Sequence, residues 1–441
     1  MKNFCIAIFL SLLLLFPYMV MAENFDVEDF FLDNGLQVVV VKNSKAPIVK
    51  QMLFYKVGAV DENKGKGGIA HLLEHLMFRG TKKVKGQEFN RILELNGADS
   101  NAFTAQDITA YHQFMDISRL ELAMFLEADR MQNLAINDSD FITERDIVYQ
   151  ERKQRIDNNP AAKFFEKVRH ALWQNHPYAN PITGYDDEIV NLSKQDAINF
   201  YKQYYAPNNA VLVLAGDIDV AIAKKMAEKY YGKLTPVFLP KKEFEKLPDN
   251  YKAKIEMELP NVKMGRFVKM IAVPSFVQDT KMAYALEVLG EYLSGDKNSP
   301  LYQKMIAKDK VALSVSAYYD GLSRSYGMFV ISVVPKVKLD SGFENIVNKG
   351  WNFALASLTE KELENVKRKM LIDLIYLKDN PESLAKTVGW MIATGLKLDD
   401  LQKYSENINN VSLKDIKSAA DYLWNDAPSA VGILYPEGEH K

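Results

Sequence analysis

Hydrophobic and polar positions alternate along the first half of the chain, first with the period of strands and then with the longer period of helices. Apolar runs on both sides of Asn34 and Gly35 predict a two-stranded hairpin over residues 30–41, because this pair suits a tight turn. A third strand is expected at 48–57, and a helix at 69–78 follows a glycine-rich loop. The remaining predicted elements are helices at 87–95, 117–131, 138–156 and 161–174 and strands at 109–114 and 210–215.

Two segments that lie 219 residues apart follow the same pattern. Ser193 opens a predicted helix that ends near Tyr205, and Ser412 opens one that ends near Trp424. Each helix is followed by a short apolar strand, at 210–215 in the first copy and 430–434 in the second. The order and spacing of these elements indicate that the chain contains two related α/β halves.

The length of the chain and one atypical segment predict the domain organisation. A chain of 441 residues is too long for one ordinary hydrophobic core. Residues 233–252 contain three prolines and many charges, which is typical of a linker. We therefore predict an N-terminal domain at 23–232, a linker at 233–252 and a C-terminal domain at 253–441.

Composition narrows the class of protein. The chain is 48% hydrophobic and 25% charged, which is typical of a soluble globular protein. Its net charge is −2, and positive and negative residues are interspersed without a long block of one sign. A nucleic-acid partner is therefore not expected, since binding to a phosphate backbone requires a basic surface.

The first 22 residues differ from the rest. Lys2 precedes an apolar run over residues 4–16, and small residues end the segment at Ala22, as in a secretory signal peptide. We predict that residues 1–22 are a cleaved signal and that the protein is secreted across the inner membrane to the periplasm. The alternative is an uncleaved anchor that holds the protein at the membrane. Cys5, the single cysteine, lies in this segment, so the mature chain has no thiol for a disulfide or a cysteine peptidase.

The residues with the clearest chemistry lie in the helix predicted at 69–78. His71, Glu74 and His75 form an H-x-x-E-H motif, which is found in zinc hydrolases. Two histidines four residues apart share one face of a helix, so both rings can reach one metal ion. Only six histidines occur in the whole chain, and two of them lie in this motif.

A catalytic zinc ion needs a third protein ligand and an open position for water. Among the downstream acidic residues, Glu151 lies in a run compatible with a helix. Glu144, Val148 and Glu151 fall on one stripe of that helix. Burying two carboxylates on one stripe is unfavourable unless a positive charge lies opposite, and zinc would supply that charge.

These motifs resemble those of the pitrilysin and mitochondrial processing peptidase family, the inverzincins. In that family the third zinc ligand is a glutamate about 76 residues after the second histidine, and Glu151 follows His75 by 76 residues. A further glutamate seven residues before this ligand supports the site, and Glu144 holds that position. The resemblance covers residues 28–436. Other matching segments are Gly68 to Ala70, Met77 to Thr81, Asn101 to Thr104, His176 to Tyr178, Gly184 to Tyr185, and Leu293 to Gly295.

The resemblance implies an α+β fold. Two homologous α/β-sandwich domains, each a mixed and largely antiparallel sheet with helices packed on it, would form a clam-like shell. It also implies one Zn²⁺ per chain and a metalloendopeptidase activity, in which Glu74 acts as the general base. Asn101 and Ala102 would lie on a sheet edge, where a peptide substrate adds as an extra strand.

One departure from the family pattern bears on assembly. The second half of family members carries an arginine and, seven residues later, a tyrosine, but Ile306 and Leu313 hold those positions here. Neither side chain can donate a hydrogen bond to a substrate carbonyl. We therefore expect a heterodimer in which a homologous partner subunit supplies the Arg/Tyr pair. Arg324 and Tyr326 leave open a substitution from a shifted position.

The fold and the remaining histidines also have alternative interpretations. The main alternative function is a non-catalytic scaffold of the same fold, although a scaffold has no need of an intact zinc motif. His112, on a predicted strand, and His176, in a His-Pro-Tyr loop, are expected to be structural rather than ligands. Because no histidine lies between His176 and His440, the second half is not expected to hold a site of the same kind.

Overall fold

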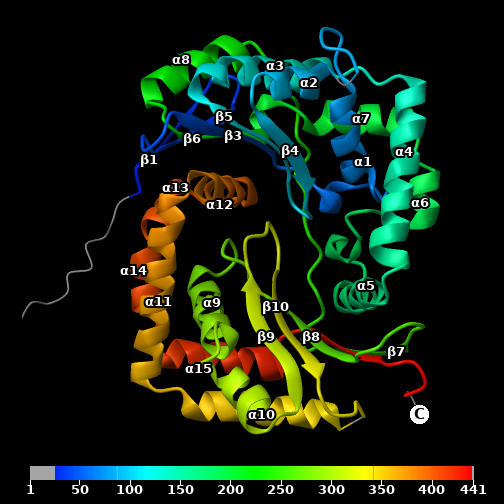
Figure 1. Cartoon of the computed structure of the whole chain (residues 1–441), viewed down its shortest axis with the longest axis vertical. Coiled ribbons are helices and arrows are strands. Elements are labelled where there is room, and N and C mark those ends of the chain that lie inside the picture. Colours follow the sequence, from blue (N-terminus) through cyan, green and yellow to red (C-terminus); the bar gives the residue numbers. More distant parts are fainter. Residues whose placement is uncertain (1–24, 87, 341, 440–441) are drawn as a thin grey trace, which may run out of the picture.

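The computed structural model describes residues 25–86, 88–340 and 342–439, and it shows two α/β domains that face each other (Figure 1). The predicted signal at 1–22 lies outside the described residues. Within the described ranges, no helix combines the length and apolar character needed to cross a bilayer.

The first domain is built on a six-stranded sheet with strand order β1-β2-β6-β3-β5-β4. All neighbouring strands are antiparallel except β2 and β6. The hairpin predicted around Asn34 and Gly35 is confirmed as β1 and β2, and β4 forms one edge of the sheet. The strands are β1 Val27–Phe31, β2 Gln37–Lys42, β3 Ile48–Tyr55, β4 Asp99–Thr104, β5 Thr109–Asp116 and β6 Ala210–Gly216.

Helices cover one face of this sheet and form the main core of the first domain. Apolar side chains that point to one side of each strand, such as Val38, Leu53 and Leu212, pack against the apolar stripes of the helices. The helices of this layer are α1 Ile69–Leu76, α2 Glu88–Leu95, α3 Leu120–Asn133, α4 Asp138–Arg152, α6 Asp186–Val190, α7 Lys194–Tyr204 and α8 Val220–Tyr231.

The second domain repeats this plan. Its sheet has the order β7-β11-β8-β10-β9, which matches β2-β6-β3-β5-β4, and the one parallel pair, β7 with β11, falls at the same place. The strands are β7 Lys252–Glu258, β8 Arg266–Val273, β9 Ala312–Asp320, β10 Gly327–Pro335 and β11 Ser429–Tyr435. The helices are α9 Thr280–Ser294, α10 Phe343–Ser357, α11 Glu360–Asp379, α13 Leu398–Gln402, α14 Tyr404–Asn410 and α15 Leu413–Asp421.

The repeat detected in the sequence corresponds to equivalent elements of the two domains. Ser193 and Asp196 form a capping box at the start of α7, and Ser412 and Asp415 form the same box at the start of α15. Each helix leads into the strand at the same place in its sheet, β6 or β11. The prediction of two homologous, largely antiparallel α/β domains is therefore confirmed.

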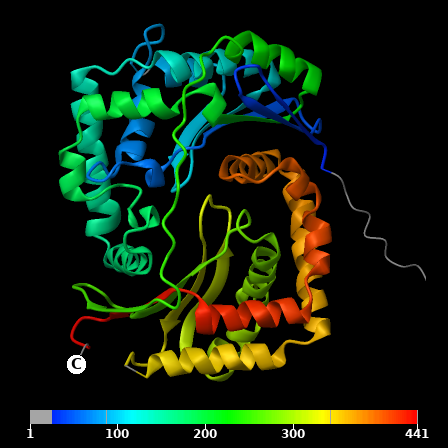
Figure 2. The same cartoon turned by 180° about the vertical axis from the view of Figure 1, so that it is seen from behind.

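Each domain covers the remaining face of the other domain's sheet with one helix. Helix α12 (Pro381–Thr394) from the second half packs on β3 and β6, and α5 (Pro160–Trp173) from the first half packs on the second sheet (Figures 1 and 2). Both helices begin with an asparagine cap followed by proline, at Asn159 and Asn380. This exchange fixes the two sheets relative to each other. The predicted linker residues from 233 to 251 form no helix or strand, and the domain boundaries stay a prediction.

Candidate metal centre

Helix α1 carries the H-x-x-E-H motif. Leu72, Leu73 and Leu76 are fully buried in the core of the first domain and fix the helix against the sheet. The helix begins after Gly68, whose positive φ of 85° suits glycine. Glu62 accepts hydrogen bonds from the backbone N–H groups at the start of the helix, which have no partner within a helix.

Helix α4 brings the predicted third ligand to α1. Val148 is fully buried between Glu144 and Glu151, so both carboxylates face α1. The Glu151 Oε2 atom lies 3.4 Å from His71 Nε2 and 3.7 Å from His75 Nε2. One ligand atom from each of these three side chains lies within 4.8 Å of the other two. The structure thus brings together the three side chains that the sequence selected.

The spacing of these atoms fits a zinc ion. Zinc bonds to nitrogen and oxygen are about 2.0–2.2 Å long, so tetrahedral ligand atoms lie about 3.3–3.5 Å apart. The two distances to Glu151 Oε2 lie close to this value. Glu151 Oε2 is also buried without a hydrogen-bond partner among the described residues, which is unfavourable for a carboxylate oxygen unless a cation binds it.

Neighbouring charged groups orient the candidate ligands. The His75 Nδ1–H donates to Glu144 Oε2 at 2.9 Å, which leaves the Nε2 lone pair directed at the metal position. Arg79 donates to the other oxygen of Glu144. Arg155 pairs with Glu151 Oε1 at 2.8 Å, so that Oε2 is the oxygen that faces the histidines. Glu144 therefore orients His75, and Arg155 orients Glu151. Neither contact uses the ligand atom that faces the metal position.

The electrostatic environment differs between the two histidines. Burial lowers the pKa of His71 to about 3, and the nearby His75 ring adds to the shift, so His71 is neutral and can donate a lone pair. The pKa of His75 is raised, because the facing carboxylates, led by Glu144, outweigh the burial that acts against the charged ring. The pKa of Glu144 is lowered although burial opposes the shift, since His75 donates to it. Glu144 is therefore ionised and holds the ring of His75.

Glu74 lies between the two histidines on α1 and points to the β4 edge. Burial raises its pKa, and a hydrogen bond from the Thr104 hydroxyl opposes that shift. Thr104 is the last residue of β4, the strand that also carries Asn101 and Ala102. The backbone N–H of Ala102 donates to the Asn101 side chain at 2.8 Å, in an exposed contact. The general-base candidate and the predicted substrate edge are therefore joined by one contact.

A cavity of about 1500 Å³ opens in front of the candidate metal centre, between the two domains. His71, Glu74 and Glu151 line it from the first domain, together with Asn101 and Ala102. The second domain contributes Met270, Tyr318 and Met328 to the opposite wall. The cavity can accommodate an extended peptide alongside β4.

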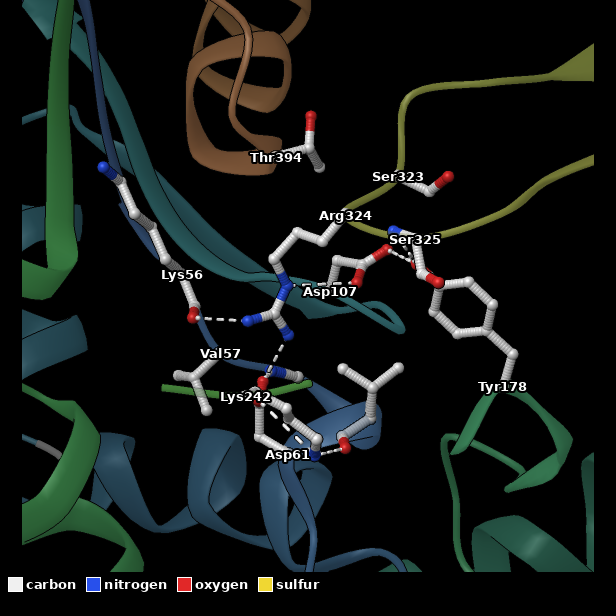
Figure 3. A network of polar contacts seen from close by, with 12 residues as sticks. Lys56, Val57, Asp61, Asp107, Tyr178, Lys242, Ser323, Arg324, Ser325 and Thr394 are labelled. Carbon is white, nitrogen blue, oxygen red and sulfur yellow. Dashed lines mark hydrogen bonds and ion pairs between the residues drawn. The ribbon is translucent and has the colours of Figure 1, made fainter. Parts of the chain in front are cut away.

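The positions that differ from the family pattern do not reach this cavity. Ile306 packs against the core of the second domain, and Leu313 is half exposed elsewhere on β9. Arg324 is engaged by two carboxylates of the first domain (Figure 3), and Tyr326 packs against Trp173. Neither Arg324 nor Tyr326 lines the cavity, so the structure gives no support to the idea that they replace the missing pair.

His112 and His176 lie outside the cluster. His112, on β5, packs near Phe103. His176 is buried between the domains, where its Nδ1 accepts from the Tyr178 backbone N–H at 3.1 Å and its Nε2 lies 3.3 Å from the Ser325 hydroxyl. His112 thus has a packing partner, and His176 has hydrogen-bond partners on both ring nitrogens.

The sequence did not assign a role to three residues that shape this site, Arg79, Thr104 and Arg155. Helical spacing could have identified Arg155, which lies four residues after its partner Glu151, in the π-helical turn that continues α4. Arg79 follows α1 in a 3₁₀ turn, and its partner Glu144 lies 65 residues away on α4. Thr104 has no local signal of this kind, because its contact with Glu74 spans 30 residues and depends on how the sheet meets α1.

Comparisons with known proteins agree with the fold and the motifs. Residues 37–186 match the family model "Insulinase (Peptidase family M16)", and residues 191–370 match "Peptidase M16 inactive domain". The chain is 29% identical to the zinc protease PqqE of Helicobacter pylori, over 93% of both chains. It is 24% identical to the mitochondrial-processing peptidase subunit beta of Lentinula edodes, over 89% of this chain and 87% of that protein. A solved structure of a protease from Helicobacter pylori superposes with a TM-score of 0.87 at 26% identity, over 93% of this chain and all of that one.

Proposed function

The chain belongs to the M16 peptidases, and from this membership we propose that it is a zinc-dependent endopeptidase that hydrolyses peptides or unfolded segments. The observation that carries the proposal is the convergence of His71, His75 and Glu151 beside Glu74 at the wall of a large cavity. His71 Nε2, His75 Nε2 and Glu151 Oε2 would hold the ion.

Each group around the site then has a distinct part in hydrolysis. Zinc bound there would polarise the scissile carbonyl and acidify a water molecule. Glu74 accepts the proton of the attacking water and returns it to the leaving amine, and its raised pKa suits a group that both takes and gives a proton. Thr104 holds the Glu74 carboxylate by its hydroxyl. Glu144 keeps His75 in the tautomer that presents Nε2.

The substrate would bind as an added strand along β4. This strand forms one edge of the first sheet and lines the cavity at Asn101 and Ala102. An incoming strand would displace the Asn101 side chain from the Ala102 N–H and accept the same hydrogen bond. Because main-chain pairing tolerates many side chains, this mode favours a broad choice of substrates.

A homologous partner subunit is part of the proposal. Ile306 and Leu313 offer no hydrogen-bond donor. The second domain lines the cavity with one tyrosine, Tyr318, but with no arginine among the described residues. The partner would supply an arginine and a tyrosine to the substrate carbonyl. Support comes from the relative named as the beta subunit of a processing peptidase. The N-terminal segment of the sequence supports secretion to the periplasm.

The test of the catalytic proposal is the substitution Glu74→Gln. It removes the general base and leaves the three candidate ligands in place. We expect one zinc per chain in elemental analysis of both the wild-type and the variant protein, with peptide hydrolysis lost only in the variant. A wild-type protein without bound metal would favour the non-catalytic scaffold instead.

Assembly is tested separately with the unmodified chain. We expect the purified chain alone to hydrolyse a casein-derived peptide mixture slowly, and addition of a homologous subunit that carries the Arg/Tyr pair to raise kcat. Full turnover by the isolated chain would contradict the need for a partner. N-terminal sequencing of the exported protein distinguishes a cleaved signal, with residue 23 first, from a retained anchor.

A further inference from the structure

Arg324 joins three polar groups of the first domain from the second (Figure 3). It lies in the turn between β9 and β10 and reaches into the first domain. Its guanidinium contacts Asp61 at 2.5 Å, Asp107 at 3.1 Å and the backbone oxygen of Lys56 at 3.3 Å. The side chains of both acids are only 4% exposed. The three contacts use the fork of the guanidinium, which a lysine could not reproduce.

The two acids lie on two neighbouring loops of the first domain. Asp61 lies in the loop 56–62 between β3 and α1, and Asp107 lies in the loop 105–108 between β4 and β5. The backbones of the loops are already bonded to each other, since the N–H groups of residues 59 and 60 donate to the oxygens of residues 105 and 106. Arg324 adds a side-chain bridge from the second domain across the same pair of loops.

Both loops lead directly to the catalytic groups. Glu62, next to Asp61, accepts hydrogen bonds at 3.0 Å from the backbone N–H groups of Gly68 and Ala70. These bonds hold the start of α1, the helix that carries Glu74. Thr104, three residues before Asp107, donates to the Glu74 carboxylate. Helix α1, which carries Glu74, follows the first loop, and β4, which ends at Thr104, precedes the second loop. A shift of one loop relative to the other would therefore move Thr104 relative to Glu74.

We propose that Arg324 is a positioning residue, which holds the α1 loop and the β4–β5 loop together so that Thr104 stays in contact with Glu74. The second domain thereby controls the geometry of a catalytic centre to which it contributes no ligand. The proposal rests on the peptidase function proposed above. Arg324 acts by holding the two loops in place, since it touches neither the candidate ligands nor the cavity.

The test compares Arg324→Met with a matched control. The control is Lys50→Met, which removes another cross-domain ion pair, since buried Lys50 on β3 pairs with Glu382 on α12 away from both loops. Peptide hydrolysis is measured well below the unfolding temperature of each variant. For Arg324→Met we expect kcat to fall about 100-fold with little change in KM, the size of effect that a misplacement of about 1 Å produces. For Lys50→Met we expect the kcat of the wild-type protein.

Two further measurements separate positioning from loss of stability. Thr104→Val should lower kcat by itself, and adding Arg324→Met to it should lower kcat no further, because both changes break the same arrangement. Hydrogen-exchange mass spectrometry of the zinc-free protein should show faster exchange over residues 56–76 in Arg324→Met only. This readout does not depend on hydrolysis, so it tests the inference even if the wild-type protein proves inactive.

The contrary results are equally specific. Additive losses for Arg324→Met and Thr104→Val, or equal kcat for Arg324→Met and Lys50→Met, would overturn the proposal. If Arg324→Met does not fold, Arg324→Lys takes its place, since it keeps one charge but not the fork. Wild-type kcat in the folded lysine variant would also overturn the proposal, whereas a reduced kcat with normal stability supports it.

Discussion

The contact between Glu144 and His75 makes the sharpest quantitative test of the site. The Glu144 carboxylate accepts from His75 Nδ1 at 2.9 Å and from Arg79, and its side chain is 5% exposed. Glu144→Gln keeps the volume of the side chain but removes the charge. The amide can still accept one hydrogen bond, yet it no longer favours the Nδ1–H tautomer of His75 or balances the Arg79 guanidinium.

The size of the effect follows from this loss. Groups that orient a metal-bound histidine contribute about 10- to 100-fold to metal affinity. That range corresponds to about 1.4–2.7 kcal/mol of zinc binding free energy. The loss of zinc affinity should lie near the upper end of this range. Without the Glu144 charge, the positive charge of Arg79 lies unbalanced beside the His75 ring and opposes a divalent cation. We therefore expect Glu144→Gln to raise the zinc dissociation constant by about 30- to 100-fold.

The assay is a competition titration of zinc against a chromogenic chelator at fixed pH. The matched control is Glu127→Gln, which removes the acid from another buried glutamate–arginine pair of the same domain, with Arg130, and touches no histidine. The control should be less stable than the wild-type protein but bind zinc with the same affinity. Equal zinc affinity in Glu144→Gln and the wild-type protein would refute the reasoning.

Three further predictions address substrate binding, packing and pH. Ala102→Pro removes the β4 N–H that donates to the Asn101 side chain. It should lower kcat/KM about tenfold, the loss of about one hydrogen bond, with zinc content unchanged. Gly389→Ala places a Cβ 2.0 Å from the Phe54 ring and should cost about 1–3 kcal/mol in a denaturant melt, since α12 has no room there; an unchanged melt would contradict the packing of α12 on the first sheet. Burial raises the pKa of the Glu287 carboxyl from 4.5 to about 7, so the folded protein binds this proton more tightly than the unfolded chain does. The stability that this proton contributes is fully present below pH 4.5 and is lost as the pH rises through 7. Glu287→Gln should therefore be about 1–3 kcal/mol more stable than the wild-type protein above pH 7 and equal to it below pH 4.5, and a pH-independent difference would contradict this assignment.

Local signals predicted the elements that hold the site. The i, i+4 spacing of His71 and His75 needed only a helix, and α1 supplies it. The stripe through Glu144 and Glu151 fixed which face of α4 is buried. The two serine-led repeats were correct because a capping box is a local interaction within four residues. In each case the signal that carried the prediction lies within one helix, so the sequence contains it.

Contacts between distant elements were beyond the sequence. The apolar faces of α5 and α12 indicate that both helices are buried, but not that each packs on the sheet of the other domain. The partner of Arg324 was missed for the same reason, since 263 residues separate it from Asp61. An arginine near the expected position suggested a catalytic role, whereas the fold places two buried carboxylates around it.

The central claim is that His71, His75 and Glu151 hold one zinc ion. Its most direct measurement is anomalous diffraction at the zinc edge from crystals of the zinc-loaded protein. We expect a single peak, about 2.0–2.2 Å from His71 Nε2, His75 Nε2 and Glu151 Oε2. A peak bound to other side chains, or no peak at this position in zinc-loaded crystals, would contradict it.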